Sequence, residues 1–225
     1  MAVTLDELTI VDSPAAWREV GFAVDGDFWV VNRTRIRLAP GDPGLGISEW
    51  SLRGIAESAE LDGIRTTRSD SPEPVPASVH PNGVTALDHV VVVTPDLERT
   101  VASLEGAGLE LRRIREEPTP AGAPRQAFFR LGAVILEVIQ EPPEAIERAG
   151  GDHPAFFWGL AFTAPDLDAT AAALGDRVGE VRDAVQPGRR IATLRRSAGL
   201  ALPVALMTPV VAGPAGGADP QAALS

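Results

Sequence analysis

Several side-chain types that commonly carry acid–base or nucleophilic chemistry are missing from this chain, which shortens the list of candidates. The 225 residues include no cysteine, no tyrosine and no lysine. Thiolate nucleophiles, disulfides, zinc–thiolate sites, Schiff bases and a tyrosine acid are therefore excluded. A histidine-dependent reaction has only His80, His89 and His153 to use.

Every basic side chain is an arginine, and many arginines fall in segments rich in β-forming residues. Because side chains alternate between the two faces of a strand, every second arginine in such a run faces inward. An inward guanidinium can bind a carboxylate or phosphate through paired hydrogen bonds; the alternative is a solvated face balanced by nearby acids. The runs are Arg112, Arg113 and Arg115, then Arg125 and Arg130, then Arg189, Arg190, Arg195 and Arg196.

Aromatic residues occur close to these arginines. Phe128 and Phe129 must face opposite sides of one strand, and a second group comprises Phe156, Phe157 and Trp158. Such rings either stack on a planar ligand or fill the core. The ligand-binding residues predicted from the sequence are Arg125, Phe128, Arg130, Trp158 and Arg190.

The charge balance narrows the range of partners. Thirty-one acidic residues against 20 basic ones give a net charge of −11, which phosphate backbones and anionic headgroups repel. The N-terminal residues carry acid where a signal peptide needs base, and no apolar stretch approaches the roughly 20 residues that cross a bilayer. We therefore expect a cytoplasmic protein with a small-molecule ligand and no nucleic-acid or membrane partner.

An internal repeat gives the strongest structural signal. Val-Val-Thr-Pro-Asp-Leu at 92–97 recurs as Phe-Thr-Ala-Pro-Asp-Leu at 162–167, and each copy follows an apolar run. Proline followed by aspartate is typical of a helix start, and an apolar i, i+4, i+7 stripe follows in both copies. Short β-rich runs separated by Pro- and Gly-containing turns come after each helix. Each copy thus reads as a βαβββ module.

These patterns predict an α+β fold in which repeated modules form a curved mixed sheet with helices on its outer face. A degenerate first module is expected over 1–55, a linker over 56–84, the paired modules over 85–210 and a disordered tail over 211–225. In the first module, residues 47–53 are taken as the last strand. Its aromatic surface must be covered, so the module either packs within the chain or pairs with its copy in a homodimer.

The phrases LDHVVVVTPDLERT and GAVILEVIQEP, within two consecutive βαβββ modules, resemble the vicinal oxygen chelate superfamily of glyoxalases, bleomycin-resistance proteins and dioxygenases. The resemblance covers 86–210 well and 5–54 loosely, and is closest to uncharacterised glyoxalase-like proteins of high-GC bacteria. In metal-dependent members, the first and last strands of each module supply the ligands. The resemblance therefore implies His89 and Glu137 as metal ligands.

The second module departs from this ligand pattern, because Gly159 stands opposite His89, and Val204 or Ala205 opposite Glu137. A third donor would have to come from Glu49, His153 or Asp88, and Glu49 occupies the last-strand place of the first module. The resemblance thus leaves open one divalent ion (nickel, manganese, iron or zinc) or none.

Two functions follow from these observations. The first is a binding protein that holds a small anionic or polar organic molecule in a sheet-lined cup with a degenerate metal site. The second is a divalent-metal-dependent lyase, isomerase or dioxygenase that uses His89 and Glu137.

Overall fold

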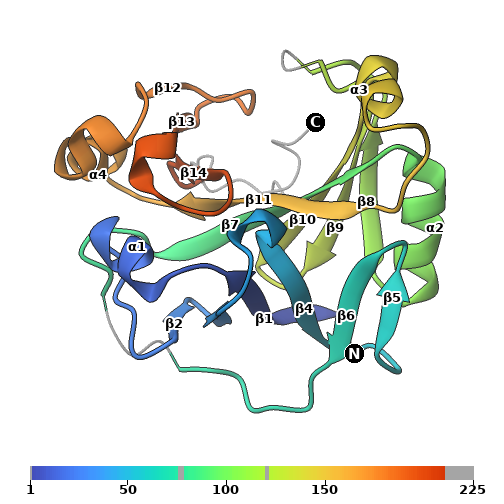
Figure 1. Cartoon of the computed structure of the whole chain (residues 1–225), viewed down its shortest axis with the longest axis horizontal. Coiled ribbons are helices and arrows are strands. Elements are labelled where there is room, and N and C mark those ends of the chain that lie inside the picture. Colours follow the sequence, from blue (N-terminus) through green and yellow to red (C-terminus); the bar gives the residue numbers. More distant parts are fainter. Residues whose placement is uncertain (1, 76–78, 120–121, 211–225) are drawn as a thin grey trace, which may run out of the picture.

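The computed structural model describes residues 2–75, 79–119 and 122–210, so the predicted tail at 211–225 lies outside the described residues. Two mixed sheets, one of six strands and one of eight, lie against each other (Figure 1). We call them sheet A and sheet B. None of the described helices has the length and apolarity needed to cross a membrane.

Sheet A is built from the first third of the chain and has the strand order β2-β3-β1-β4-β6-β5. Its elements are β1 (Thr4–Val11), α1 (Pro14–Glu19), β2 (Phe28–Val31), β3 (Thr34–Ala39), β4 (Ile47–Arg53), β5 (Ala59–Leu61) and β6 (Ile64–Arg68).

Sheet B contains the two predicted modules in the order β12-β13-β14-β11-β7-β10-β9-β8. The first module comprises β7 (Ala86–Thr94), α2 (Leu97–Gly106), β8 (Glu110–Arg115), β9 (Gln126–Leu131) and β10 (Val134–Gln140). After α3 (Pro143–Arg148), the second comprises β11 (Phe156–Thr163), α4 (Leu167–Leu174), β12 (Arg182–Asp183), β13 (Arg190–Thr193) and β14 (Val204–Met207). The predicted α+β fold with paired modules in one mixed sheet is confirmed.

The two modules meet through their first strands. β7 and β11 pair antiparallel at the centre of sheet B, and each pairs in parallel with the last strand of its own module, β10 or β14. Asp96 and Asp166 cap the two helices by accepting hydrogen bonds from the backbone N–H groups of Arg99 and Ala169. The proline of each motif precedes the cap instead of starting the first turn.

Sheet A repeats this plan in a shorter form, which corrects the prediction for the first module. β1 and β4 pair antiparallel at the centre, while β3 lies parallel to β1 and β6 parallel to β4. β4 is therefore the first strand of a second, helix-free half and not the last strand of one module. The residues that complete this half, β5 and β6, lie in the predicted linker, so that expectation is wrong for 59–68.

Four of the five aromatic residues of the first region are buried within the single chain, namely Trp17, Phe22, Trp29 and Trp50. Trp17 and Phe22 lie 6.4 and 5.0 Å from Phe162 of β11 between ring centres, and Trp50 contacts Phe157 edge-on. Packing within the chain, one of the two predicted possibilities, therefore covers this surface, and a homodimer stays a prediction.

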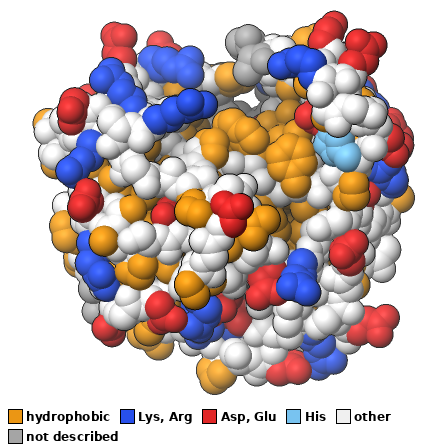
Figure 2. All heavy atoms as spheres, in the orientation of Figure 1, with side chains coloured by type: hydrophobic (Ala, Val, Ile, Leu, Met, Phe, Trp, Pro, Cys, Tyr) orange, Lys and Arg blue, Asp and Glu red, His pale blue; other side chains and the backbone are white. Residues whose placement is uncertain are grey.

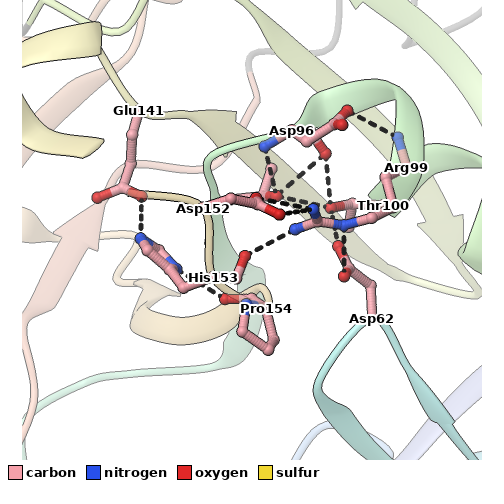
Figure 3. Close-up of polar contacts among 9 residues, drawn as sticks. Asp62, Asp96, Arg99, Thr100, Glu141, Asp152, His153 and Pro154 are labelled. Atoms are coloured by element: carbon pink, nitrogen blue, oxygen red, sulfur yellow. Dashed lines mark hydrogen bonds and ion pairs between the residues drawn. The ribbon is translucent and has the colours of Figure 1, made fainter. Parts of the chain in front are cut away.

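A polar network fixes sheet A to the helix side of sheet B (Figure 3). Asp62, in the β5–β6 turn, accepts hydrogen bonds from Arg99 and Thr100 of α2. The Arg99 guanidinium also binds the Asp152 carboxylate and the His153 carbonyl oxygen. One arginine thereby ties three segments together.

Candidate functional site

The two faces of sheet B differ sharply in character. One face packs against sheet A and the helices and carries the buried side chains of Val90, Val92, Phe129 and Leu136. The opposite face is open, and we call it the cup. Figure 2 shows hydrophobic side chains gathered in a hollow between the β12–β14 side and the α3 side, with charged side chains around it.

Strand register fixes which side chains share the cup. Arg113 of β8 lies opposite Phe128 of β9, Phe128 opposite Glu137 of β10, and Glu137 opposite Val91 of β7. Directly opposed residues project from the same face of a sheet. These four side chains therefore form one row across the cup, and His89 lies in the adjacent row, opposite Ile135.

His89 and Glu137 converge in the cup from the neighbouring parallel strands β7 and β10. The His89 Nε2 atom lies 3.6 Å from a carboxylate oxygen of Glu137, and both side chains are mostly shielded from solvent, 15% and 17% exposed. Gln126 donates a hydrogen bond to the other Glu137 oxygen. The structure thus brings together the two residues that the resemblance singled out.

Asp88 and Arg189 support His89 from behind. Asp88 is an extra residue of β7 at a bulge against β11, and its carboxylate lies 2.9 Å from His89 Nδ1. Because a carboxylate only accepts hydrogen bonds, Nδ1 carries the proton and Nε2 faces Glu137. Arg189, which is 4% exposed, holds the other side of Asp88 with two hydrogen bonds and also donates to the Thr208 carbonyl oxygen.

The electrostatics of this group favour the charged forms of Asp88 and His89 and disfavour the charged form of Glu137. Burial alone would raise the pKa of Asp88, but hydrogen bonds from His89 and Arg189 hold it well below its usual range. Burial opposes the charged form of His89, yet the Asp88 hydrogen bond and the charge of Glu137 raise its pKa overall. Burial raises the pKa of Glu137 against the opposing effect of His89.

Arg113 is a half-buried arginine on the cup face that has no carboxylate partner among the described residues. Its guanidinium lies 5.0 Å from the centre of the Phe128 ring, and it makes no ion pair with any residue that the structure describes. Arg115, two residues along the same strand, reaches Glu117 at 3.6 Å. In an acidic protein, a half-buried arginine without an acid is a positive charge that a ligand anion can pair with.

Two arginines predicted as ligand-binding lie elsewhere. Arg125 forms ion pairs with Glu98 of α2 and with Glu116, and Arg190 forms an ion pair with Asp168 of α4. Both therefore project to the helix side, because strand alternation turns them away from the cup. We correct these two assignments.

The remaining predicted ligand-binding residues stay on the open side of sheet B. Phe128 lies in the centre of the cup, beside Glu137. Arg130 shares the row of His89 but is exposed, with Nε donating to the carbonyl oxygen of Gly132. Trp158 is an extra residue of β11 at a second bulge, and its indole is half exposed where Phe157 fills the core face.

The donor set does not fit a divalent ion bound by three protein ligands. His89 and Glu137 supply two, while Asp88 is committed to His89 Nδ1 and Arg189. Glu49 lies on β4 of sheet A opposite Thr9, and His153 pairs with Glu141 at 3.0 Å. Within 2–75, 79–119 and 122–210, no three His, Asp or Glu side chains converge as metal ligands.

The expectation for Glu49 is wrong for a topological reason. It equated β4 with the last strand of a module, which is parallel to the first strand, as β10 is to β7. β4 instead runs antiparallel to β1. Glu49 is therefore not equivalent to Glu137.

The second module cannot complete the ligand set. Ala205 pairs with Ala161 as Glu137 pairs with Val91, so a methyl group takes the place of the carboxylate. At Gly159, a Cβ atom would lie 2.6 Å from the Pro203 carbonyl oxygen, too close for any side chain without backbone movement. Position 159 therefore has no room for a ligand side chain, and the side chain at 205 has no donor atom.

Arg113 and Arg189 were in the predicted arginine runs but not among the residues selected from them. Strand alternation was a signal that could have chosen Arg113, which lies two positions from Arg115 on β8, whereas Arg189 precedes β13 and has no such signal. The bulge at Asp88 left no trace in the sequence.

Comparisons with known proteins agree with this architecture. Residues 88–193 match the family model described as Glyoxalase/Bleomycin resistance protein/Dioxygenase superfamily. No curated protein matches the chain in sequence.

Similar solved structures cover a little more than half of the chain. Methylmalonyl-CoA epimerase from Mycobacterium tuberculosis is 21% identical, with a TM-score of 0.47, over 56% of this chain and 89% of its own. A variant of the Streptomyces coelicolor enzyme in complex with 2-nitronate-propionyl-CoA is 23% identical (TM-score 0.46), over 57% of this chain and 96% of its own. A hypothetical protein from Bacillus halodurans is 16% identical (TM-score 0.46), over the same shares.

Proposed function

We propose that this chain, whose residues 88–193 belong to the glyoxalase/bleomycin resistance protein/dioxygenase superfamily, binds a small organic anion in the cup of sheet B. The observation that carries the proposal is Arg113, a half-buried guanidinium on the cup face without a carboxylate partner among the described residues. A ligand carboxylate would supply that partner through paired hydrogen bonds.

The surroundings of Arg113 favour an organic anion over an inorganic one. Phe128, under the guanidinium, and Val91 and Ile135 give the ligand body an apolar surface in adjoining rows. Ligand sites commonly combine such a surface with a few convergent polar groups. The cup therefore suits a molecule with an anionic end and an apolar or aromatic body.

His89 and Glu137 give the ligand a second polar anchor. At a separation of 3.6 Å, His89 Nε2 and the Glu137 carboxylate oxygen can each accept a hydrogen bond from a ligand hydroxyl placed beside the pair. Asp88 and Arg189 keep the His89 ring in one orientation, which lowers the entropy lost on binding.

A thermal-shift screen tests the proposal. Small aromatic and aliphatic carboxylic acids should raise the melting temperature in a concentration-dependent way, while the matching primary amides should not, because only the acid neutralises Arg113. If amides and acids stabilise the protein equally, or neither does across a varied set, the proposal is wrong.

The convergence of His89 and Glu137 also favours one alternative, a divalent-metal-dependent lyase, isomerase or dioxygenase. The same screen should include Ni²⁺, Mn²⁺, Fe²⁺ and Zn²⁺. A large stabilisation by one ion that disappears in His89→Ala would support the alternative, with the third ligand then coming from solvent or substrate.

A further inference from the structure

A second cavity lies between the two sheets, on the face of sheet B opposite the cup. Its volume is about 240 Å³, somewhat below the roughly 300–1,000 Å³ of drug-sized sites. The cavity is bordered by the start of β1, the β2–β3 turn, the end of β4 and the β9–β10 turn. His89, Glu137 and Arg113 do not line this cavity.

The apolar wall comes from both sheets. Leu5 of β1 faces Leu87, Leu131 and Val134 of sheet B, and all four side chains are otherwise buried. Gly132 holds the sheets together here, because a Cβ on it would lie 3.0 Å from a methyl group of Thr4. The wall is therefore a fixed apolar surface and not a loose gap.

Polar side chains form another part of the cavity wall, and Thr34 is one of them. Thr34 lines the cavity and is 3% exposed, yet its hydroxyl makes no hydrogen bond to any described residue. The hydroxyl is therefore a free donor at the cavity wall, available to an acceptor on a ligand.

Arg53 adds a positive charge to the same wall. Its Nε atom donates to the Ser71 carbonyl oxygen, and Nη2 donates to Asp6 and to the Pro72 carbonyl oxygen. Nη1 makes no hydrogen bond within the described part of the chain. The guanidinium is thus held in place from one side with two N–H groups to spare.

Arg33 and Glu73 line the cavity where it reaches the surface, and they contact each other. Arg33 and Glu73 form an ion pair of 2.9 Å with side chains 71% and 51% exposed. Exposed pairs of this kind contribute little, about 0–1 kcal/mol, so a ligand can separate them at small cost.

We propose that this inter-sheet cavity is a second ligand site, for a short amphipathic carboxylate. The carboxylate accepts hydrogen bonds from the Thr34 hydroxyl and Arg53 Nη1, and the hydrocarbon part packs on Leu87, Leu131 and Val134. The site is independent of the cup, since these three residues lie on the face of sheet B opposite His89 and Glu137.

Methyl NMR on the full chain tests the site with three probes of equal chain length: hexanoate, hexanol and hexylamine. Hexanoate should shift the methyl resonances of Leu87, Leu131 and Val134 in a saturable way, with hexanol and hexylamine binding at least about tenfold more weakly. Cup methyl groups, such as those of Val91 and Ile135, report separately on the cup.

Thr34→Val, which keeps the shape and removes the hydroxyl, should weaken hexanoate binding at Leu131 about tenfold, and Thr34→Ser should restore it. Arg113→Met should leave this binding unchanged. The inference is wrong if hexanoate shifts only cup methyl groups, shifts none, or binds Thr34→Val as well as the wild type.

Discussion

The two halves of sheet B share a topology but not a chemistry. Both contain a central strand paired in parallel with a last strand, and both helices begin with an aspartate cap. The first half places His89 and Glu137 in the cup, where the second places Gly159 and Ala205. The two halves therefore have the same fold, but only the first half has the polar residues of the site.

The second half still contributes one charged residue to the first. Arg189, which immediately precedes β13, reaches across to Asp88 of β7 and completes the support of His89. The halves are thus complementary, one holding the polar groups of the site and the other stabilising them.

The largest effect is expected from removing that contribution. Arg189→Met leaves the Asp88 carboxylate without its main partner, which should lower the free energy of unfolding by about 3 kcal/mol. Urea denaturation measures it. Arg190→Met, which breaks only an exposed pair with Asp168, should cost less than about 1 kcal/mol.

Adding Asp88→Asn to Arg189→Met should recover part of the loss, because no buried charge then lacks a partner. A cost below about 1 kcal/mol for Arg189→Met would show that the two halves are not coupled in this way.

A smaller loss of stability is expected from adding a side chain at Gly159, the position that corresponds to His89 in the other half. Gly159→Ala places a methyl group 2.6 Å from the Pro203 carbonyl oxygen and should destabilise the protein by about 2 kcal/mol. Gly106→Ala, at a helical position with open space, is the matched control and should be neutral or slightly stabilising. Equal thermal stability of the two variants would mean that position 159 can accept a ligand residue.

The pKa values of two shielded histidines, His80 outside the cup and His89 inside it, should be shifted in opposite directions. Burial lowers the pKa of His80, which packs beside Phe22 outside the cup, whereas Asp88 and Glu137 overcome burial and raise the pKa of His89. NMR titration of the ring protons should place one value below about 6.5 and the other above it. Two values on the same side would contradict the electrostatic account of the cup floor.

The lowered pKa of His80 also determines how the stability of the fold depends on pH. The unfolded chain protonates His80 near pH 6.5 before the folded chain does, so this residue makes stability fall as pH decreases below about 6.5. His80→Asn should therefore lose less stability than the wild type between about pH 7.5 and about pH 5.5. Equal losses in urea denaturation would show that His80 does not contribute.

The sequence predicted sheet B well and sheet A poorly, for reasons that can be traced to particular residues. Asp96 and Asp166 act locally, so the offset of 70 that relates them could be read directly from the chain. Whether β4 pairs with β1 in parallel or antiparallel depends on contacts distant in sequence. The wrong choice there produced the wrong expectation for Glu49.

The candidate site could be predicted only in part, because its geometry also depends on contacts between residues distant in sequence. His89 and Glu137 were found by resemblance, and their proximity follows from the parallel pairing of β7 and β10. The choice among arginines depended on strand register, which a bulge between Leu111 and Arg113 alters by one residue on β8. Arg125 and Arg190 were selected in place of Arg113 and Arg189.

The central claim is that the first half of sheet B binds a small organic anion through Arg113. Isothermal titration of the most stabilising carboxylic acid against Arg113→Met and Arg190→Met tests it most directly. We predict that Arg113→Met weakens binding at least about tenfold and that Arg190→Met leaves the affinity unchanged. Unchanged affinity in Arg113→Met, or equal weakening in both variants, would contradict the claim.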